Sequence, residues 1–151
     1  MNDPQTGAIE LLTFRLAQQE YALNIMCVRE IRGWTQATPL PHAPNYMKGV
    51  INLRGTVLPV MDLGHRLNLP EQSETERNVI IVVKYGETMM GLLVDAVSDI
   101  VQLTSDDLQP PPEAVTSAAE SVVQSLTLID ERMIRVLDLS ATIDIPESTA
   151  A

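Results

Sequence analysis

The chain has 151 residues, of which 45% are hydrophobic and 3% aromatic, and twenty acidic residues against ten basic ones give it a net charge of -10. This length allows one domain or two small modules with a common core, and the core must be aliphatic. A charge of this sign repels phosphate backbones and anionic lipids, so we expect neither nucleic acid nor a membrane surface as a partner.

Cysteine content and hydropathy indicate a cytoplasmic protein. The single cysteine, Cys27, has no partner for an internal disulfide, which suits a reducing compartment. No apolar run approaches the roughly 20 residues of a membrane helix, and the first ten residues have neither the basic region nor the apolar core of a signal peptide. The polar ends, residues 1–8 and 144–151, are predicted to be flexible tails.

Two segments predict β-hairpins. LLTFRL (residues 11–16) and YALNI (21–25) flank a polar turn, and NVIIVVKY (78–85) and MMGLLVDAV (89–97) flank a turn that contains glycine. Runs of five to eight residues rich in Val and Ile with such punctuation favour strands over helices. We therefore expect a mainly β chain.

Helices are predicted to be short. We expect helical turns at residues 45–49 and 63–67, the second with Asp62 as its N-cap, and in parts of 113–123. Because proline cannot pair within a central strand, two proline-rich segments are predicted loops: residues 38–44 and 109–114.

The chain contains an internal repeat. Residues 12–31 align with 80–100 at a shift of 69 residues (Leu23 to Leu92), and residues 56–63 align with 132–139 at a shift of 76 (Val60 to Val136). Apolar alternation alone produces some such matches, but both copies also end on an acidic residue followed by Ile or Leu. Each copy reads as hairpin, long loop and hairpin, which suits a small five-stranded barrel. Two barrels of this size would be marginal alone, so we expect them to share an aliphatic seam.

The sequence argues against an enzyme. It lacks a nucleophile elbow, a phosphate loop and a dinucleotide fingerprint. Asp62 and His65 have the spacing of two metal ligands but no third ligand nearby, so we expect no metal and no cofactor. Cys27 lies among aliphatic residues, where an inert buried thiol is expected. The acidic pairs 106–107 and 130–131 are predicted turn residues.

Arg54 interrupts the apolar run KGVINLRGTVLPVMDL (48–63). An arginine beside a glycine turn can point into water, or it can be held by a carboxylate. Glu30 is the best candidate for that carboxylate, because the VREI segment should run close to this strand in a small barrel. From the residues alone, both interpretations stay open.

Three motifs resemble the CheW family of chemotaxis coupling proteins: VREIRGW (28–34), NYMKGVINLRGTVLPVMDL (45–63) and GLLVDAVSDI (91–100). Their order and spacing also match, over roughly residues 10–140. The resemblance implies one CheW-like domain over 10–143, built of two intertwined five-stranded SH3-like β-barrels (about 10–67 and 78–143) that may exchange strands. It also implies a non-catalytic adaptor.

The family joins the cytoplasmic tips of chemoreceptors to the histidine kinase CheA, docks on the CheW-like regulatory domain of the kinase and alternates with it in rings. By resemblance, Glu30 and Arg54 match residues linked to receptor coupling. Val28, Gly49 and Val97 match positions that line or support the receptor-binding side. For the kinase contact only a region carries over, the loops and edge strands of one barrel, and no residue. The isolated protein is expected to be a monomer that is recruited to membrane-associated receptor arrays.

The chain departs from the family near its end. Residues 121–133 lack the usual Tyr and Gly, and Pro146 shortens the last helix. These departures suit a variant adaptor of a secondary chemosensory or type IV pilus pathway, or a decoy that binds kinase but not receptor. A small-ligand-binding β-barrel protein is the alternative function from outside the adaptors.

In the second copy of the repeat, the turn that corresponds to Arg54–Gly55 carries Asp130–Glu131, so the barrel itself does not require the arginine. This asymmetry favours Arg54 as a partner-surface residue held by Glu30.

Overall fold

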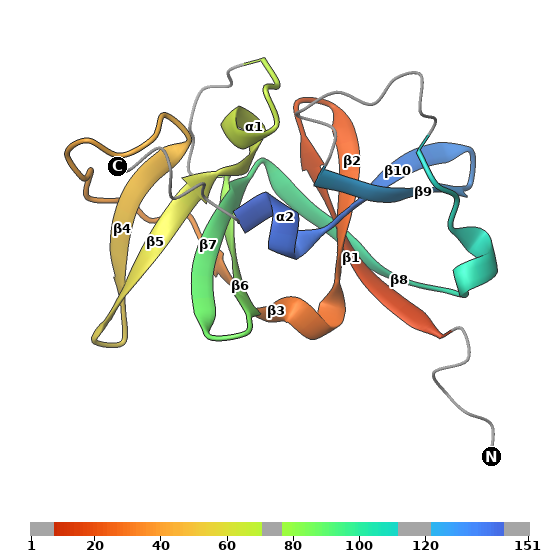
Figure 1. The fold of residues 1–151 in the computed structure, drawn as a ribbon, viewed down its shortest axis with the longest axis horizontal. Coiled ribbons are helices and arrows are strands. Elements are labelled where there is room, and N and C mark those ends of the chain that lie inside the picture. The colour runs from red at the N-terminus through yellow and green to blue at the C-terminus, as the bar shows by residue number, and fades with distance from the viewer. Residues whose placement is uncertain (1–7, 71–76, 112–121, 144–151) are drawn as a thin grey trace.

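The protein consists of two five-stranded sheets with few and short helices (Figure 1). The computed structural model describes residues 8–70, 77–111 and 122–143, and the predicted tails lie almost wholly outside these ranges. Its elements are, in chain order, β1 (Ile9–Leu16), β2 (Gln19–Asn24), the 3-10 helix η1 (Ile25–Cys27), β3 (Val28–Gly33), β4 (Met47–Leu53), β5 (Thr56–Asp62), α1 (Leu63–Arg66), β6 (Val79–Tyr85), β7 (Thr88–Val94), β8 (Ala96–Leu103), the 3-10 helix η2 (Ser105–Asp107), β9 (Val123–Ile129), β10 (Arg132–Leu137) and α2 (Leu139–Ile143).

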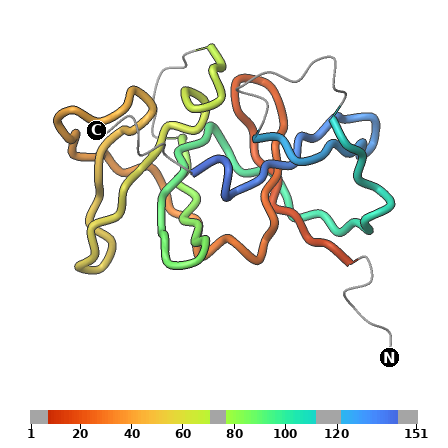
Figure 2. The backbone as a smooth tube through the Cα atoms, viewed as in Figure 1, coloured from red at the N-terminus to blue at the C-terminus, as the bar shows by residue number. Residues whose placement is uncertain are grey.

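Each sheet contains strands from both halves of the chain. Sheet 1 has the order β8-β1-β2-β10-β9, and sheet 2 has the order β3-β6-β7-β5-β4. The hairpin that opens each half therefore pairs directly with two strands of the other half and shares its sheet with a third. Figure 2 shows the two crossings, where the chain leaves β2 for β3 and leaves β7 for β8. The expected mainly β fold with an internal duplication is confirmed, and the segment between the hairpins of each half contains a strand, β3 or β8.

Backbone pairings repeat between the two sheets. In sheet 2 the parallel pair β5·β7 places Val60 opposite Gly91, and in sheet 1 the parallel pair β10·β2 places Val136 opposite Ala22. Val136 follows Val60 by 76 residues and Gly91 follows Ala22 by 69, which are the two shifts of the repeat. An isolated bridge also occurs twice, Thr38–Val50 and Gln109–Leu126, each with two backbone hydrogen bonds of 2.7 to 2.9 Å. In each sheet the chain that leaves one edge strand therefore returns to the strand at the opposite edge, and the sheet curls.

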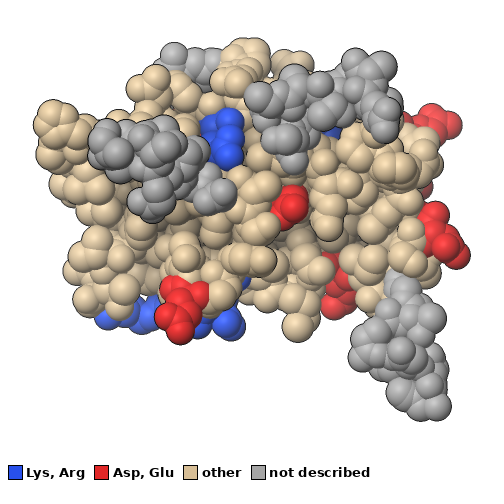
Figure 3. Space-filling model, in the orientation of Figure 1, with Lys and Arg blue, Asp and Glu red and all other residues tan. Residues whose placement is uncertain are grey.

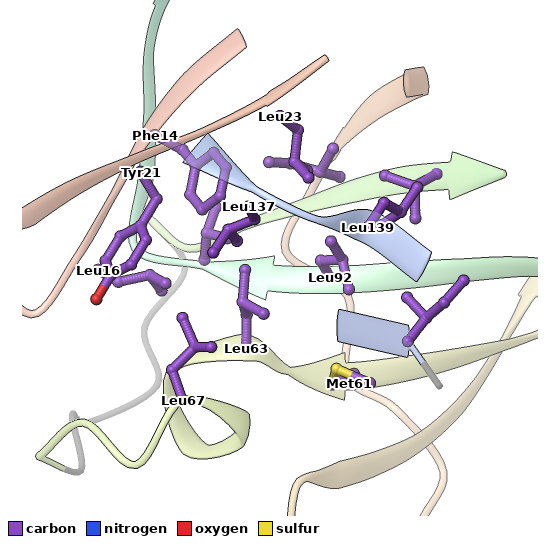
Figure 4. Close-up of a cluster of buried hydrophobic side chains, with 14 of the residues drawn as sticks. Phe14, Leu16, Tyr21, Leu23, Met61, Leu63, Leu67, Leu92, Leu137 and Leu139 are labelled. Carbon is purple, nitrogen blue, oxygen red and sulfur yellow. The ribbon is translucent and has the colours of Figure 1, made fainter. Parts of the chain in front are cut away.

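Buried side chains form three clusters, one on each sheet and one between them. The cluster between the sheets is the predicted aliphatic seam, with Phe14 and Tyr21 stacked at 6.2 Å between ring centroids (Figure 4). Alternation along β2 explains the division, because Tyr21 and Leu23 enter the seam while Ala22 enters the cluster of sheet 1. The seam fixes the two sheets against each other.

One predicted helix is wrong. Residues 45–46 form a turn, in which the Met47 N–H donates to the Pro44 carbonyl oxygen, and β4 begins at Met47. The segment is extended because it pairs with β5 and because Gly49 has a φ of 141°, far from helical values. The helix at 63–67 is confirmed as α1, whose N-cap Asp62 accepts from the His65 N–H. Residues 113–121 of the third prediction lie outside the described ranges, and Val123 begins β9.

Sheet 1 holds an ion pair between a buried carboxylate and a partly exposed arginine. Glu20 of β2 has only 5% of its side chain exposed, and both its carboxylate oxygens accept from Nη1 of Arg132, at 2.9 and 3.0 Å. A buried carboxylate needs such a partner, because its desolvation is costly.

Arg132→Ala is expected to destabilise the fold by about 3 kcal/mol, because it leaves the Glu20 carboxylate buried without its cation. Urea unfolding followed by circular dichroism measures the loss. The double variant Glu20→Gln with Arg132→Ala should recover much of it, since no charge is then buried. An unfolding midpoint of Arg132→Ala equal to that of the wild type would contradict this account.

Candidate functional site

Glu30, Arg54 and Arg32 form one ion-pair cluster, called here the Glu30 cluster. Arg54 donates from Nη2 to Oε1 of Glu30 at 2.7 Å, and Arg32 donates from Nη1 to Oε2 at 3.1 Å. The two arginines use different carboxylate oxygens, so both bonds exist together. The predicted contact between Glu30 and Arg54 is therefore present.

The curl of sheet 2 brings the members of the Glu30 cluster together. Alternation along β3 places Glu30 and Arg32 on the same side of the strand. Arg54 occupies the two-residue turn between β4 and β5, with φ of 50° followed by 88° at Gly55, and the Gly55 N–H donates to Oδ1 of Asn52 at 2.7 Å. Because β3 and β4 are opposite edges of sheet 2, the contact between Glu30 and Arg54 joins the two edges.

Electrostatics within the Glu30 cluster favour the charged forms. The hydrogen bond from Arg54, and then that from Arg32, hold the pKa of Glu30 below its ordinary value of 4.5, and Glu30 raises the pKa of Arg54. Because the pKa of Glu30 is lower in the folded state, the cluster's contribution to stability is complete above about pH 4.5 and is lost as the pH falls through the lower, folded-state value.

Gly49 lies where two backbone segments approach closely. It is buried in β4 at a shift of register, and a Cβ atom there would overlap the carbonyl oxygen of Thr38. Since the Thr38–Val50 bridge passes at this point, the absence of a side chain lets the chain after β3 reach β4.

Val28 and Val97 support the seam. The two residues are equivalent in the repeat, and each is partly buried against the seam cluster. Val28 lies opposite Val83 of β6, and Val97 lies opposite Phe14 of β1. Of the five residues that the sequence singled out, the structure therefore brings two into direct contact, Glu30 and Arg54. Contact of any of the five with a receptor stays a prediction.

The charges of the described residues divide between the sheets. In Figure 3, most Lys and Arg in view gather along the lower edge at the left, around one acidic group, and the other acidic side chains in view lie at the centre and over the right half. Sheet 2 with its adjoining loops carries Arg29, Arg32, Lys48, Arg54, Arg66, Arg77 and Lys84 against Glu30, Asp62 and Glu87. Sheet 1 with its loops carries Arg15, Arg132 and Arg135 against Glu10, Glu20, Asp95, Asp99, Asp106, Asp107, Asp130, Glu131 and Asp138. Among the described residues, the Glu30 cluster thus lies with the sheet that carries more basic than acidic side chains.

The repeat supplies an internal comparison for the Glu30 cluster. Glu30, Arg32 and Arg54 correspond to Asp99, Val101 and Asp130 in the second half. The turn is the same in both halves, since Asp130 and Glu131 have φ of 52° and 68°. The fold therefore forms this strand and turn without any arginine, and the cluster is a property of one face of the molecule.

Within residues 8–70, 77–111 and 122–143, no three or more His, Cys, Asp or Glu side chains gather where they could hold a metal ion. A search of the same residues finds no helix with the length and apolar character to span a membrane. A groove on sheet 1 is lined by uncharged side chains: Ile9, Leu11, Asn24, Leu108, Gln109, Pro110, Gln124, Ser125, Val136 and Leu137.

Comparison with known proteins decides the family. The family model described as CheW-like domain matches residues 10–147. The chain belongs to the CheW family. It is 49% identical over 145 residues to the probable chemotaxis protein CheW of Rhizobium etli, covering 96% of this chain and 94% of that one. It is 36% identical over 135 residues to the chemotaxis protein CheW of Klebsiella aerogenes, covering 89% of this chain and 81% of that one.

A solved structure shows the same fold. The crystal structure of the scaffolding protein TtCheW from Thermoanaerobacter tengcongensis superposes with a TM-score of 0.84 at 30% identity, covering 91% of this chain and 93% of that one. As a member of the CheW family, the chain is a scaffold protein of chemotaxis.

Arg32 is a member of the Glu30 cluster that was not predicted from the sequence. The signal was available, because a residue two positions after Glu30 on a strand lies on the same face. The β-strand character of VREIRG (28–33) therefore predicts that both side chains point the same way. The sequence led to the prediction of one cation for the Glu30 carboxylate, Arg54, and the second cation, Arg32, was missed.

Proposed function

We propose that this CheW-family protein is a non-catalytic adaptor that couples chemoreceptors to the histidine kinase CheA. One surface docks on the cytoplasmic tip of a receptor and another on the CheW-like regulatory domain of the kinase, which recruits the protein to membrane-associated receptor arrays. The observation that carries the receptor side is the Glu30 cluster, a solvent-facing ion-pair cluster that the second half of the same fold lacks.

Exposed apolar side chains occur on the strands next to the Glu30 cluster and support a docking surface for a helical hairpin, although alternation along β3 turns Ile31 to the other side of the strand from Glu30 and Arg32. Ile31 lies between Glu30 and Arg32 on β3, Val57 follows the Arg54 turn on β5, and both are exposed. Exposed aliphatic side chains beside a held arginine suit a partner with an apolar face and an acceptor group. We expect the receptor hairpin to place its apolar face against this part of sheet 2.

Coupling requires two surfaces on one molecule and no turnover. Simultaneous binding raises the local concentration of kinase beside the receptor. A change in receptor packing that alters the affinity of one surface alters the other by linkage, because the seam holds the two sheets as one body.

Arg54→Ala is expected to lower receptor-dependent kinase stimulation about tenfold while leaving the unfolding temperature near that of the wild type. The side chain is 69% exposed, so its removal costs binding rather than packing. Phosphorylation of the kinase in the presence of receptor and adaptor measures the effect. Arg15→Ala removes the same charge from an exposed position on sheet 1 and is the matched control. Equal stimulation by Arg54→Ala and Arg15→Ala would refute the proposed receptor surface.

Pull-downs with the receptor tip and the kinase regulatory domain, each alone, separate the adaptor from a decoy. The adaptor is expected to bind both, and Arg54→Ala to weaken only the receptor interaction. Binding of the kinase domain alone would indicate a decoy, and receptor tips from a pilus system as the sole ligands would indicate a secondary pathway.

A further inference from the structure

We propose that Arg32 is a positioning residue of the receptor-docking surface, which retains Glu30 when Arg54 turns toward an acceptor group on the partner. The inference rests on the proposed function and adds to it a third residue and the way in which the cluster opens. Its basis is the shared use of one carboxylate by two arginines of different exposure.

The geometry assigns different roles to the two arginines. Arg54 has 69% of its side chain exposed and sits on a hairpin turn, whereas Arg32 has 33% exposed and sits within β3 beside Glu30. Each arginine bonds its own oxygen of Glu30, at 2.7 Å and 3.1 Å. Arg54 can therefore leave Oε1 without disturbing the bond between Arg32 and Oε2.

Charge balance gives Arg32 its effect on docking. With both arginines the cluster carries a net charge of one positive unit, so Arg54 can be used by a partner while Glu30 and Arg32 remain a neutral pair. Without Arg32 the cluster is neutral, and departure of Arg54 leaves a partly buried carboxylate without a cation. An unpaired charge is costly in proportion to its burial, and the side chain of Glu30 is only 28% exposed. Removal of Arg32 should therefore weaken docking through Arg54, although Arg54 itself is unchanged.

The position of Arg32 is energetically unfavourable for one of its nitrogen atoms. Its Nε is buried and is the one such side-chain nitrogen or oxygen among the described residues that makes no hydrogen bond. The guanidinium thus gives up one donor while Nη1 binds Glu30. The fold does not require an arginine here, because Val101 occupies the equivalent position of β8. An arginine whose placement the fold does not require points to a role in the Glu30 cluster.

The test is a double-mutant cycle on binding of a purified receptor-tip fragment to the full-length protein, measured by titration calorimetry. Arg32→Ala is expected to weaken binding about tenfold, and Arg32→Lys, which keeps the charge, to weaken it less. In a Glu30→Gln background the same Arg32→Ala change should have less than about a threefold effect, because no carboxylate then needs a cation. Arg29→Ala, an exposed arginine on the same strand, is the control for loss of charge.

Two results would overturn the inference and leave the proposed function intact: Arg32→Ala binds like the wild type while Arg54→Ala binds weakly, or Arg32→Ala weakens binding equally with Glu30 and with Gln at position 30. The second result would give Arg32 a direct or purely structural role. If the wild type does not bind the receptor tip, or Arg54→Ala binds as tightly as the wild type, the proposed receptor surface itself fails. Thermal melting of each variant confirms that binding is measured on folded protein.

Discussion

Glu30→Lys should reduce receptor-dependent stimulation of the kinase about a hundredfold while the protein stays folded. The substitution replaces the carboxylate that accepts from Arg54 and Arg32 by a third cation. Three like charges then repel one another, so the Arg54 turn loses its attachment to β3 and the docking surface loses its arrangement. The fold should tolerate the change, because Glu30 is only partly buried and the seam lies elsewhere.

The repeat provides the matched control for this reversal. Asp99→Lys makes the same change in charge at the equivalent position of β8, where Val101 and Asp130 replace the two arginines. It should leave receptor-dependent stimulation near the wild-type level. Kinase phosphorylation and binding to the receptor tip measure both variants, and circular dichroism verifies the fold. If Glu30→Lys and Asp99→Lys have equal effects, the response reports net charge and the Glu30 cluster has no special role.

Much of the fold was accessible from the sequence because the chain encodes the same unit twice. Matching positions of apolar and acidic residues indicated the duplication, the two sheets and their seam, and the structure repeats even an isolated bridge in each half. The contact between Glu30 and Arg54 was also predicted, since a small curled sheet brings its edge strands close and few carboxylates are near enough.

Strand exchange was not derivable from the residues themselves. Alternation shows that one face of a hairpin is buried, but it does not tell which other strands bury it. The parallel pairings β5·β7 and β10·β2 come from opposite halves of the chain, and nothing in residues 56–62 or 132–137 specifies that choice locally. The exchange entered the expectations through the family resemblance alone.

The wrongly predicted helix at 45–49 has a related cause. A proline just before a short segment is a typical signal for a helix start, but the pairing of β4 with β5 and the bridge to Thr38 decide the conformation. The importance of Gly49 was likewise visible only as a family position, because its reason is the approach of a backbone carbonyl from eleven residues earlier.

Gly49→Ala is therefore expected to destabilise the protein by at least about 3 kcal/mol. A Cβ atom would overlap the Thr38 carbonyl oxygen, which accepts from the Val50 N–H, while the Thr38 N–H donates to the Val50 carbonyl oxygen. The φ of 141° is itself unfavourable for alanine. Urea unfolding measures the loss. Gly33→Ala on β3 is the control, because its added methyl group would meet no atom within 4 Å.

The Gly49 and Glu30 variants should both lose receptor coupling, but for different reasons that stability separates. Glu30→Lys acts on the surface ion pairs and should lower the unfolding midpoint far less than Gly49→Ala does. Gly49→Ala acts on the bridge that brings the two edges of sheet 2 together, and the Arg54 turn lies at the end of the strand that this bridge holds. A Gly49→Ala protein with wild-type stability and lost coupling would instead place Gly49 in the partner contact. A destabilised Gly49→Ala protein would indicate that Gly49 supports the receptor surface by holding the two edges of sheet 2 together.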